Sequence, residues 1–295
     1  MMKNNFDIPI LLLTFNRLEI LKKTFSQIKK IKPTKLYISS DGPRNEKEFN
    51  QVNEVRIYID TEIDWECEIV KIYHDTNLGC KNAVSKAITT FFSYEEMGIV
   101  LEDDCFPSLS FFHYCKELLA LYKDDERIYS ISGYNQQNYW PIKAGDYFFS
   151  KLGNCWGWAS WRRCWINYDV NIADFKKFVD EDGFKNSLGK ELGKIKEKMI
   201  RDGVILGKAD SWALQWGYLR HKNSGLTCIP TKSLIENIGF GDLATHTKEF
   251  NPHNVSANEI NFPLKENLFV VADESYDNLM FKKTNPLKRI IQKFF

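Results

Sequence analysis

The 295-residue sequence lacks several features that would by themselves assign it to a class. Its seven cysteines contain no C-x-x-C pair, which argues against a zinc site and a disulfide framework and favours a reducing compartment. With 40 basic and 39 acidic residues, the chain has no overall positive field to attract nucleic acid. It also has no hydrophobic run long enough to cross a bilayer and no G-x-x-x-x-G-K-[ST] phosphate loop. We therefore expect a cytoplasmic protein that does not bind nucleic acid.

The residues that are present favour an α/β fold. Hydrophobic residues make up 43% of the chain and aromatic residues 14%, enough for a large core. Strand-like segments at 8–14, 35–40, 68–73 and 98–101 alternate with helix-like segments at 18–31, 46–59, 79–92 and 111–122. This alternation predicts a mainly parallel central sheet flanked by helices. Aromatic segments around 139–165, a charged helical stretch near 174–201 and a glycine-rich loop at 237–242 follow.

An acidic triplet is the most informative local feature. The apolar strand within GIVLEDDCF ends in Glu102, Asp103 and Asp104. Crowded carboxylates repel one another, and a divalent cation such as Mg²⁺ or Mn²⁺ relieves that repulsion while also binding substrate phosphates. The alternative is an acidic turn that caps a helix beginning near Pro107. From the triplet alone both readings stay open.

Further polar residues follow the predicted strands. Arg17 comes after the first strand and Asp41 after the second, so both can reach one crevice with the triplet. An ordinary helix start and a plain Asp-Gly-Pro turn explain them equally simply. The loop Asn77-Leu78-Gly79 opens the helix that carries Lys81, which can face a phosphate, although a turn without function explains this loop nearly as well.

Tryptophans gather in two segments of the second half. The strings CWGWASWRRCW and ADSWALQW contain Trp156, Trp158, Trp161, Trp165, Trp212 and Trp216. We expect most of these rings to lie in the core, because indoles are large and apolar, and one or two to stack on a sugar ring. Asp210 is a lone acid in its aromatic segment, which favours a functional carboxylate there.

Six weak motifs in one order resemble a known family. The chain is similar to inverting nucleotide-sugar glycosyltransferases of GT-A fold, in particular to the N-acetylglucosaminyltransferase I group and its bacterial relatives. The resemblance spans roughly residues 8–250. The matching motifs are Ile8 to Arg17, Ser40-Asp41-Gly42, Glu102-Asp103-Asp104, Phe148-Phe149 with Trp156-Gly157-Trp158, Asp210-Ser211-Trp212, and Phe240-Gly241 with Thr245-His246-Thr247.

The resemblance implies a role for each matched position. Arg17, Asp41 and Asp103 would contact uridine and ribose, Asp104 would hold Mn²⁺ or Mg²⁺ at the diphosphate, Glu102 would lie near the donor sugar, and Asp210 would be the catalytic base. We assign Lys81, Trp156 and Thr245 to donor binding as well. His246 is a metal or phosphate ligand or simply a loop residue.

The expected activity is the transfer of a sugar, with inversion, in bacterial surface polysaccharide assembly. The expected donor is a nucleotide sugar with UDP as its nucleotide, and the expected acceptor is a glycan or a lipid-linked molecule. The rivals are a metal-dependent nucleotidyl- or phosphoryltransferase and a non-catalytic sugar-binding or assembly protein. The family's Golgi members are tethered and disulfide-bonded, whereas we expect this chain to have no membrane anchor and to have reduced cysteines. Its acceptor-binding segments do not match those of the family.

The predicted organisation is one domain at 1–278, with a nucleotide-binding half at 1–125 and an acceptor-shaping half at 126–278. We expect the loop around 237–247 to order over the diphosphate. The tail at 279–295 has Leu287, Ile290, Ile291 and Phe294 at helical spacing beside basic residues. Such a segment can contact the inner face of the plasma membrane or dock on the protein itself.

Overall fold

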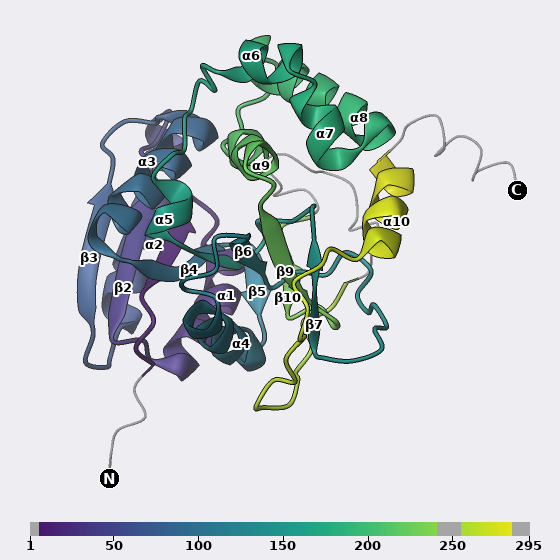
Figure 1. Ribbon diagram of the computed structural model, residues 1–295. Coiled ribbons are helices and arrows are strands. Elements are labelled where there is room, and N and C mark those ends of the chain that lie inside the picture. Colours follow the sequence, from purple (N-terminus) through teal and green to yellow (C-terminus); the bar gives the residue numbers. More distant parts are fainter. Residues whose placement is uncertain (1–5, 241–254, 285–295) are drawn as a thin grey trace, which may run out of the picture.

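A computed structural model describes residues 6–240 and 255–284, and an eight-stranded sheet runs through its centre (Figure 1). The strand order is β3-β2-β1-β4-β8-β6-β9-β7. The strands are β1 Ile10–Thr14, β2 Lys35–Ser40, β3 Glu68–Tyr73, β4 Met97–Glu102, β6 Ile128–Ser132, β7 Tyr147–Ser150, β8 Trp158–Trp161 and β9 Leu226–Pro230. A second, two-stranded sheet pairs β5 (Cys105–Pro107) with β10 (Ile235–Asn237).

The first four strands are parallel, and their ends place the site. Leu13 lies opposite Glu102 in β4, and Thr14 lies opposite Ser40 in β2. The carboxyl ends of β1, β2 and β4 therefore meet at one edge of the sheet. The chain places β2 and β3 in turn on one side of β1 and then crosses back to place β4 on its other side. The strand order therefore reverses next to β1, and ligands usually bind at the carboxyl edge of such a point.

Helices cover both faces of the parallel half. Helices α1 (Leu18–Ile31), α2 (Glu46–Glu62) and α4 (Leu109–Leu121) pack together on one face, and α3 (Gly79–Tyr94) with α5 (Arg162–Trp165) lies on the other (Figure 1). The two central strands between them, β1 and β4, are almost fully buried and are mainly apolar in sequence, as a doubly covered sheet requires, whereas β3 at the edge is partly exposed. The predicted α/β class with a mainly parallel sheet is confirmed.

The second half adds a separate helical layer beside β7 and β9. It contains α6 (Phe175–Asp180), α7 (Gly183–Leu188), α8 (Lys190–Ile200), a π-helical turn η1 (Arg201–Ile205), α9 (Ala213–Lys222) and α10 (Glu274–Thr284). Phe175, Phe184 and Tyr218 form the centre of its apolar cluster, which also buries Tyr276 and Met280 of α10. The predicted boundary after residue 278 falls inside α10.

Most tryptophans belong to the core, as expected. Trp158, Trp165, Trp212 and Trp216 are buried and pack ring against ring, with Trp158 and Trp212 stacked at 5.8 Å. The seven cysteines are free thiols. In the ranges 6–240 and 255–284, no helix combines the length and apolar character needed to span a membrane. Thr245, His246 and the amphipathic segment at 287–294 lie outside the described residues.

Candidate active site

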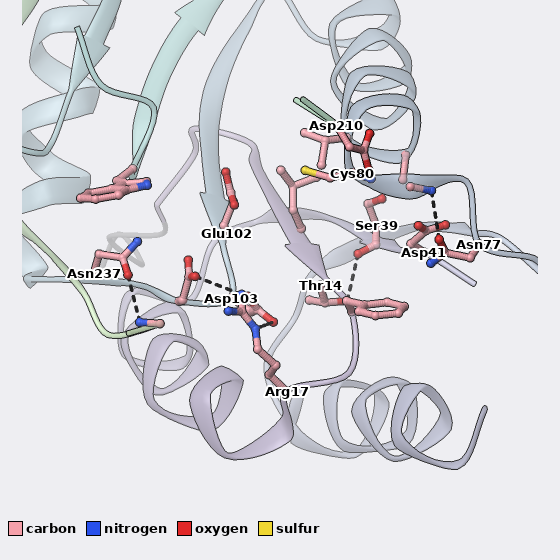
Figure 2. A pocket seen from close by; sticks show the side chains of 18 of the residues that line it. Thr14, Arg17, Ser39, Asp41, Asn77, Cys80, Glu102, Asp103, Asp210 and Asn237 are labelled. Atoms are coloured by element: carbon pink, nitrogen blue, oxygen red, sulfur yellow. Dashed lines mark hydrogen bonds and ion pairs between the residues drawn. The ribbon is translucent and has the colours of Figure 1, made fainter. Parts of the chain in front are cut away.

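A cavity of about 400 Å³ lies at the carboxyl edge of β1, β2 and β4 (Figure 2). Side chains from widely separated parts of the chain line it, including Arg17, Asp41, Glu102, Asp210 and Asn237. All the predicted site residues within the described ranges line this cavity except Lys81. The structure therefore brings together positions that are up to about two hundred residues apart in the sequence.

The acidic triplet forms one wall of the cavity. The Arg17 guanidinium hydrogen-bonds both carboxylate oxygens of Asp103 and lies 3.0 Å from Asp104 Oδ2. Burial and the adjacent Asp104 and Asp103 carboxylates raise the pKa of Glu102 to about 8. Burial also raises the pKa of Asp103 to about 6, although Arg17 opposes that rise. One arginine thus leaves the repulsion among three acids only partly compensated.

The triplet is not the first turn of a helix. The residues after it form β5, and α4 begins only at Leu109, two residues beyond Pro107. The amides at the start of α4 are satisfied by Glu259, which accepts from Leu109 N at 3.0 Å and Ser110 N at 2.8 Å. The helix-capping alternative for the triplet is therefore wrong, because a different carboxylate performs that task.

Asp41 connects the end of β2 to the loop before α3. Its Oδ1 accepts hydrogen bonds from Gly42 N at 2.8 Å and Leu78 N at 3.0 Å. Asn77 in the same loop donates to the Gly42 carbonyl at 2.8 Å. Both Asp41 and Asn77 line the cavity, and the second Asp41 oxygen has no hydrogen-bond partner among the described residues.

Asp210 reaches the cavity from the segment before α9 and caps α3. Its Oδ2 accepts from Cys80 N at 2.8 Å and its Oδ1 from Lys81 N at 2.9 Å. A side chain on residue 79 would bring its Cβ to 2.9 Å from Asp210 Oδ2, and Gly79 has a φ of +78°, so glycine is required there. The carboxylate thus satisfies two free amides at the positive end of the helix.

This arrangement differs from the expectation for Lys81. The sequence predicts that the loop before α3 brings Lys81 to face a phosphate. Instead Asp210 takes the amides of residues 80 and 81, and the Lys81 side chain is not among those lining the cavity. At this end of α3 the Asp210 carboxylate would repel an anionic group of a ligand.

Trp156 and the segment after β10 close the opposite side. The Trp156 ring is half-buried and packs edge-on against Tyr134 at 4.8 Å and Phe240 at 5.8 Å. Gly239 lies so close to Asp104 that a Cβ would stand 2.2 Å from Asp104 Oδ2. Ile238 N donates to the Asp104 carbonyl at 2.8 Å, which fixes this segment against the acidic triplet.

Acidic groups outnumber basic ones in the lining of the cavity. Five carboxylates line the cavity with two guanidinium groups, and one of these, Arg44, is paired with Glu48. Within the described part of the chain no three acidic, histidine or cysteine groups converge as a ready-made metal site. Magnesium-type ions, however, commonly take one or two protein carboxylates and complete their shell with water and phosphate oxygens. Asp104, beside Glu102, fits that pattern.

Several lining residues were not predicted. Thr14 is the last residue of β1 and Ser39 is the penultimate residue of β2, and Thr14 Oγ1 donates to the Ser39 carbonyl at 2.9 Å. Cys80 and Asn237 line the same cavity. Thr14 could have been found from its place at a strand end. Burial and the Glu102 and Asp210 carboxylates raise the pKa of Cys80 to about 12, so its thiol is not a ready nucleophile.

Comparisons with known proteins assign no family. No protein-family model matches the chain, and no curated protein matches it. Similar solved structures include HddC from Yersinia pseudotuberculosis, with 10% identity, a TM-score of 0.34 and coverage of 57% of this chain and 83% of that one. Another is a putative glucose-1-phosphate thymidylyltransferase from Bacillus anthracis, with 10% identity, a TM-score of 0.33 and coverage of 67% and 84%.

A third similar structure is 4-diphosphocytidyl-2C-methyl-D-erythritol synthase from Anaerococcus prevotii, with 11% identity, a TM-score of 0.31 and coverage of 59% of this chain and 78% of that one. Two of these names describe enzymes that handle nucleotides. At such identities and TM-scores the likenesses assign no activity to this chain.

Proposed function

We propose that this protein is a metal-dependent inverting glycosyltransferase that takes a sugar from a nucleoside diphosphate donor, with UDP as the nucleotide. The observation that carries the proposal is the excess of carboxylates in a cavity at the carboxyl edge of a parallel sheet. A diphosphate would be repelled by this lining on its own. Together with a divalent cation it would be attracted, because the cation neutralises both partners.

In this proposal the donor lies across the ends of β1, β2 and β4. Asp41 lines the cavity and has one carboxylate oxygen without a hydrogen-bond partner among the described residues, and it would accept from a base N–H or a ribose hydroxyl. Asp104 would hold the cation, and Arg17 keeps the neighbouring Asp103 carboxylate in place. A bound cation would supply positive charge for the departing diphosphate.

Asp210 would serve as the base. It would take the proton of an acceptor hydroxyl as the hydroxyl oxygen forms its bond to the anomeric carbon and the bond to the nucleoside diphosphate breaks. Each Asp210 oxygen accepts one backbone hydrogen bond, so each keeps a lone pair for this purpose. The two bonds to α3 also fix the carboxylate, which favours proton transfer in one defined direction.

A nucleotidyltransferase is the second candidate, because it also needs a cation held by carboxylates. One feature of the chain counts against it. Only residues 15–17 separate β1 from α1, without a glycine, and both arginines in the cavity lining are already paired with acids. A triphosphate would find neither a backbone cradle nor a free basic clamp at this edge.

The test is a pair of reactions on the purified protein with Mn²⁺. In the first, a panel of nucleotide sugars is incubated with protein and the release of nucleoside diphosphate is measured. In the second, nucleoside triphosphates are supplied with sugar 1-phosphates and pyrophosphate is measured. Release of UDP from a UDP-sugar, abolished by EDTA, is the expected result. Pyrophosphate release would favour the second candidate, and inactivity in both reactions despite nucleotide binding would favour a binding protein.

A further inference from the structure

A second cavity, of about 220 Å³, lies beside the acidic cavity described above, and its lining is basic. Its lining comes from α8, α9 and residues 152–156, and it includes Lys196, Arg220 and His221. Among the described residues, no acidic one belongs to that lining. Trp156 lines both cavities, so the two are neighbours.

Arg220 is the decisive residue. Its side chain is buried, with 5% of the residue exposed, and no ion pair joins it to any carboxylate of the described chain. Its Nη1 donates to Thr227 Oγ1 at 2.6 Å, whereas its buried Nε has no hydrogen-bond partner among the described residues. A buried guanidinium without a counter-charge is costly, since such groups are normally paired.

Two further basic residues, Lys196 and His221, lie in the same lining as Arg220, and Lys196 adds to the excess of positive charge there. Burial and the Arg220 charge lower the pKa of Lys196 to about 8. Burial likewise lowers the pKa of His221, with Arg220 and Lys196 adding to the effect, so His221 is neutral. Two cations therefore share a pocket in which no described residue of opposite charge is paired with either of them. An anion would relieve both their repulsion and their desolvation.

Two glycines leave the room that an anion would need. A Cβ on Gly153 would stand 2.6 Å from Arg220 Nη1, so a larger residue there would displace the guanidinium from its present position. Gly217 lies inside α9, where glycine costs a helix about 1 kcal/mol relative to alanine. A Cβ there would meet no atom within 4 Å, so packing does not require the glycine, and its absence of a side chain keeps the cavity open.

We propose that this second cavity, which we call the Arg220 pocket, binds a carboxylate or phosphate group of the acceptor substrate. The identification of that ligand as the acceptor rests on the proposed function. The anion would pair with Arg220 and Lys196, while the rest of the acceptor would extend past Trp156 toward Asp210. Such a ligand belongs to the class of acidic sugars or sugar phosphates, and a neutral glycan would leave Arg220 unpaired.

The test measures anion binding directly. Inorganic phosphate and D-glucuronate are titrated into the full-length protein by calorimetry, with D-glucose as the neutral control, and the same probes are used in thermal unfolding. We expect saturable binding and stabilisation by at least one of the two anions and none by glucose. The stronger probe identifies the preferred group, whether phosphate or carboxylate.

Two variants assign that binding to the pocket. Gly217→Leu keeps every charge and fills the cavity, and it improves helix propensity, so it is expected to fold. Lys196→Met removes one cation, and the exposed Lys194 on the same helix provides the matched control Lys194→Met. We expect Gly217→Leu and Lys196→Met to weaken anion binding by about tenfold or more, the value of a charge-assisted hydrogen bond, and Lys194→Met to leave it unchanged.

Absence of anion binding by the wild type, or equal binding by Gly217→Leu, would overturn this inference. Titration of UDP with Mn²⁺ into the same proteins distinguishes a failure of this inference from a failure of the proposed function. Loss of anion binding with retained UDP binding in Gly217→Leu supports an independent pocket. If the wild type binds the anion but not UDP, the proposed function is contradicted, whereas anion binding by the Arg220 pocket is still supported.

Discussion

Asp210 illustrates how one side chain in this protein serves two purposes. It caps α3 through the amides of Cys80 and Lys81, and it lines the cavity where we propose that it removes a proton. Neither the cap nor its partner helix could be inferred locally, because 130 residues separate Asp210 from Cys80. Its isolation in an apolar segment identified it as unusual, but only the fold explains how it is held.

The two roles make separable predictions for Asp210→Asn. Asparagine has one acceptor oxygen, so one amide bond to α3 is lost, and we expect stability to fall by about 0.5–2 kcal/mol. Loss of the base should lower turnover by about 10²–10⁴. Urea unfolding and initial rates with a UDP-sugar measure the two effects.

The control is Asn45→Ala, which removes the cap of α2, where Asn45 Oδ1 accepts from Glu48 N at 3.0 Å. It should lose similar stability and keep its turnover; an equal loss of turnover in both variants would remove Asp210 from the chemistry.

Substitution of Asp104, unlike that of Asp210, is expected not to lower the stability of the metal-free protein. Its charge raises the pKa of both Glu102 and Asp103, so it destabilises the folded metal-free protein. Asp104→Asn relieves that repulsion while the amide oxygen can still accept from Arg17. We expect the melting temperature in EDTA to be unchanged or higher than that of the wild type. A decrease of many degrees would mean that the carboxylate is needed for folding instead of for a ligand.

Lys196 provides a pH-dependent prediction. Its pKa falls from 10.5 in the unfolded chain to about 8 in the folded protein. The unfolded chain therefore binds this proton first as the pH decreases, so folding stability declines between pH 10.5 and 8 and stays reduced below pH 8. Lys196→Met removes this penalty. We expect it to be more stable than the wild type at pH 7, by on the order of 1 kcal/mol, and to lose that advantage near pH 10. Urea unfolding in an anion-free zwitterionic buffer measures the difference, with Lys194→Met as control; an advantage independent of pH would contradict the assignment.

At the scale of elements, the first hundred residues follow their sequence pattern closely. The predicted segments 18–31, 35–40 and 68–73 are α1, β2 and β3 without any change of boundary. Their apolar periodicity and local turns are sufficient to define them. The predicted helices at 46–59 and 79–92 are each two or three residues longer in the structure. Helix ends depend on capping contacts, which periodicity does not reveal.

The short sheet of β5 and β10 could not be predicted from the sequence, and the reason is physical. Each strand has three residues, too few for a period of two to be visible, and β5 pairs with a segment about 130 residues later. That pairing brings Gly239 against Asp104 and thereby completes the acidic wall. The sequence indicated a glycine-rich loop here, but not what the glycine touches.

Gly239 allows this element to be tested. A Cβ at this position would collide with Asp104 Oδ2, so Gly239→Ala should displace the carboxylate and weaken Mn²⁺-dependent UDP binding by about tenfold or more. The matched control is Gly193→Ala on α8, where the new Cβ would stand 2.6 Å from the Phe184 carbonyl oxygen, far from the acidic triplet in the sequence. Both variants should lose some stability, and only Gly239→Ala should lose UDP affinity by calorimetry. Unchanged affinity in Gly239→Ala would show that the position of Asp104 is not critical.

At the scale of the whole molecule, charge is divided between two neighbouring cavities. The total is nearly neutral, yet one cavity collects carboxylates from the ends of parallel strands and the other holds unpaired cations between α8 and α9. The first was predictable, because the carboxyl ends of parallel strands converge. The second was not, since Lys196 and Arg220 are unremarkable basic residues of two helices until the fold buries them together.

The central claim is that the acidic cavity binds a nucleoside diphosphate through a divalent cation. The most direct test is calorimetric titration of UDP, with GDP, CDP and dTDP for comparison, into the wild type and Asp104→Asn, each in Mn²⁺ and in EDTA. The account predicts saturable binding of one nucleotide per chain by the wild type in Mn²⁺, and binding at least about 100-fold weaker in EDTA or in Asp104→Asn. Absence of binding by all four nucleotides, or equal affinity with and without the cation, would contradict it.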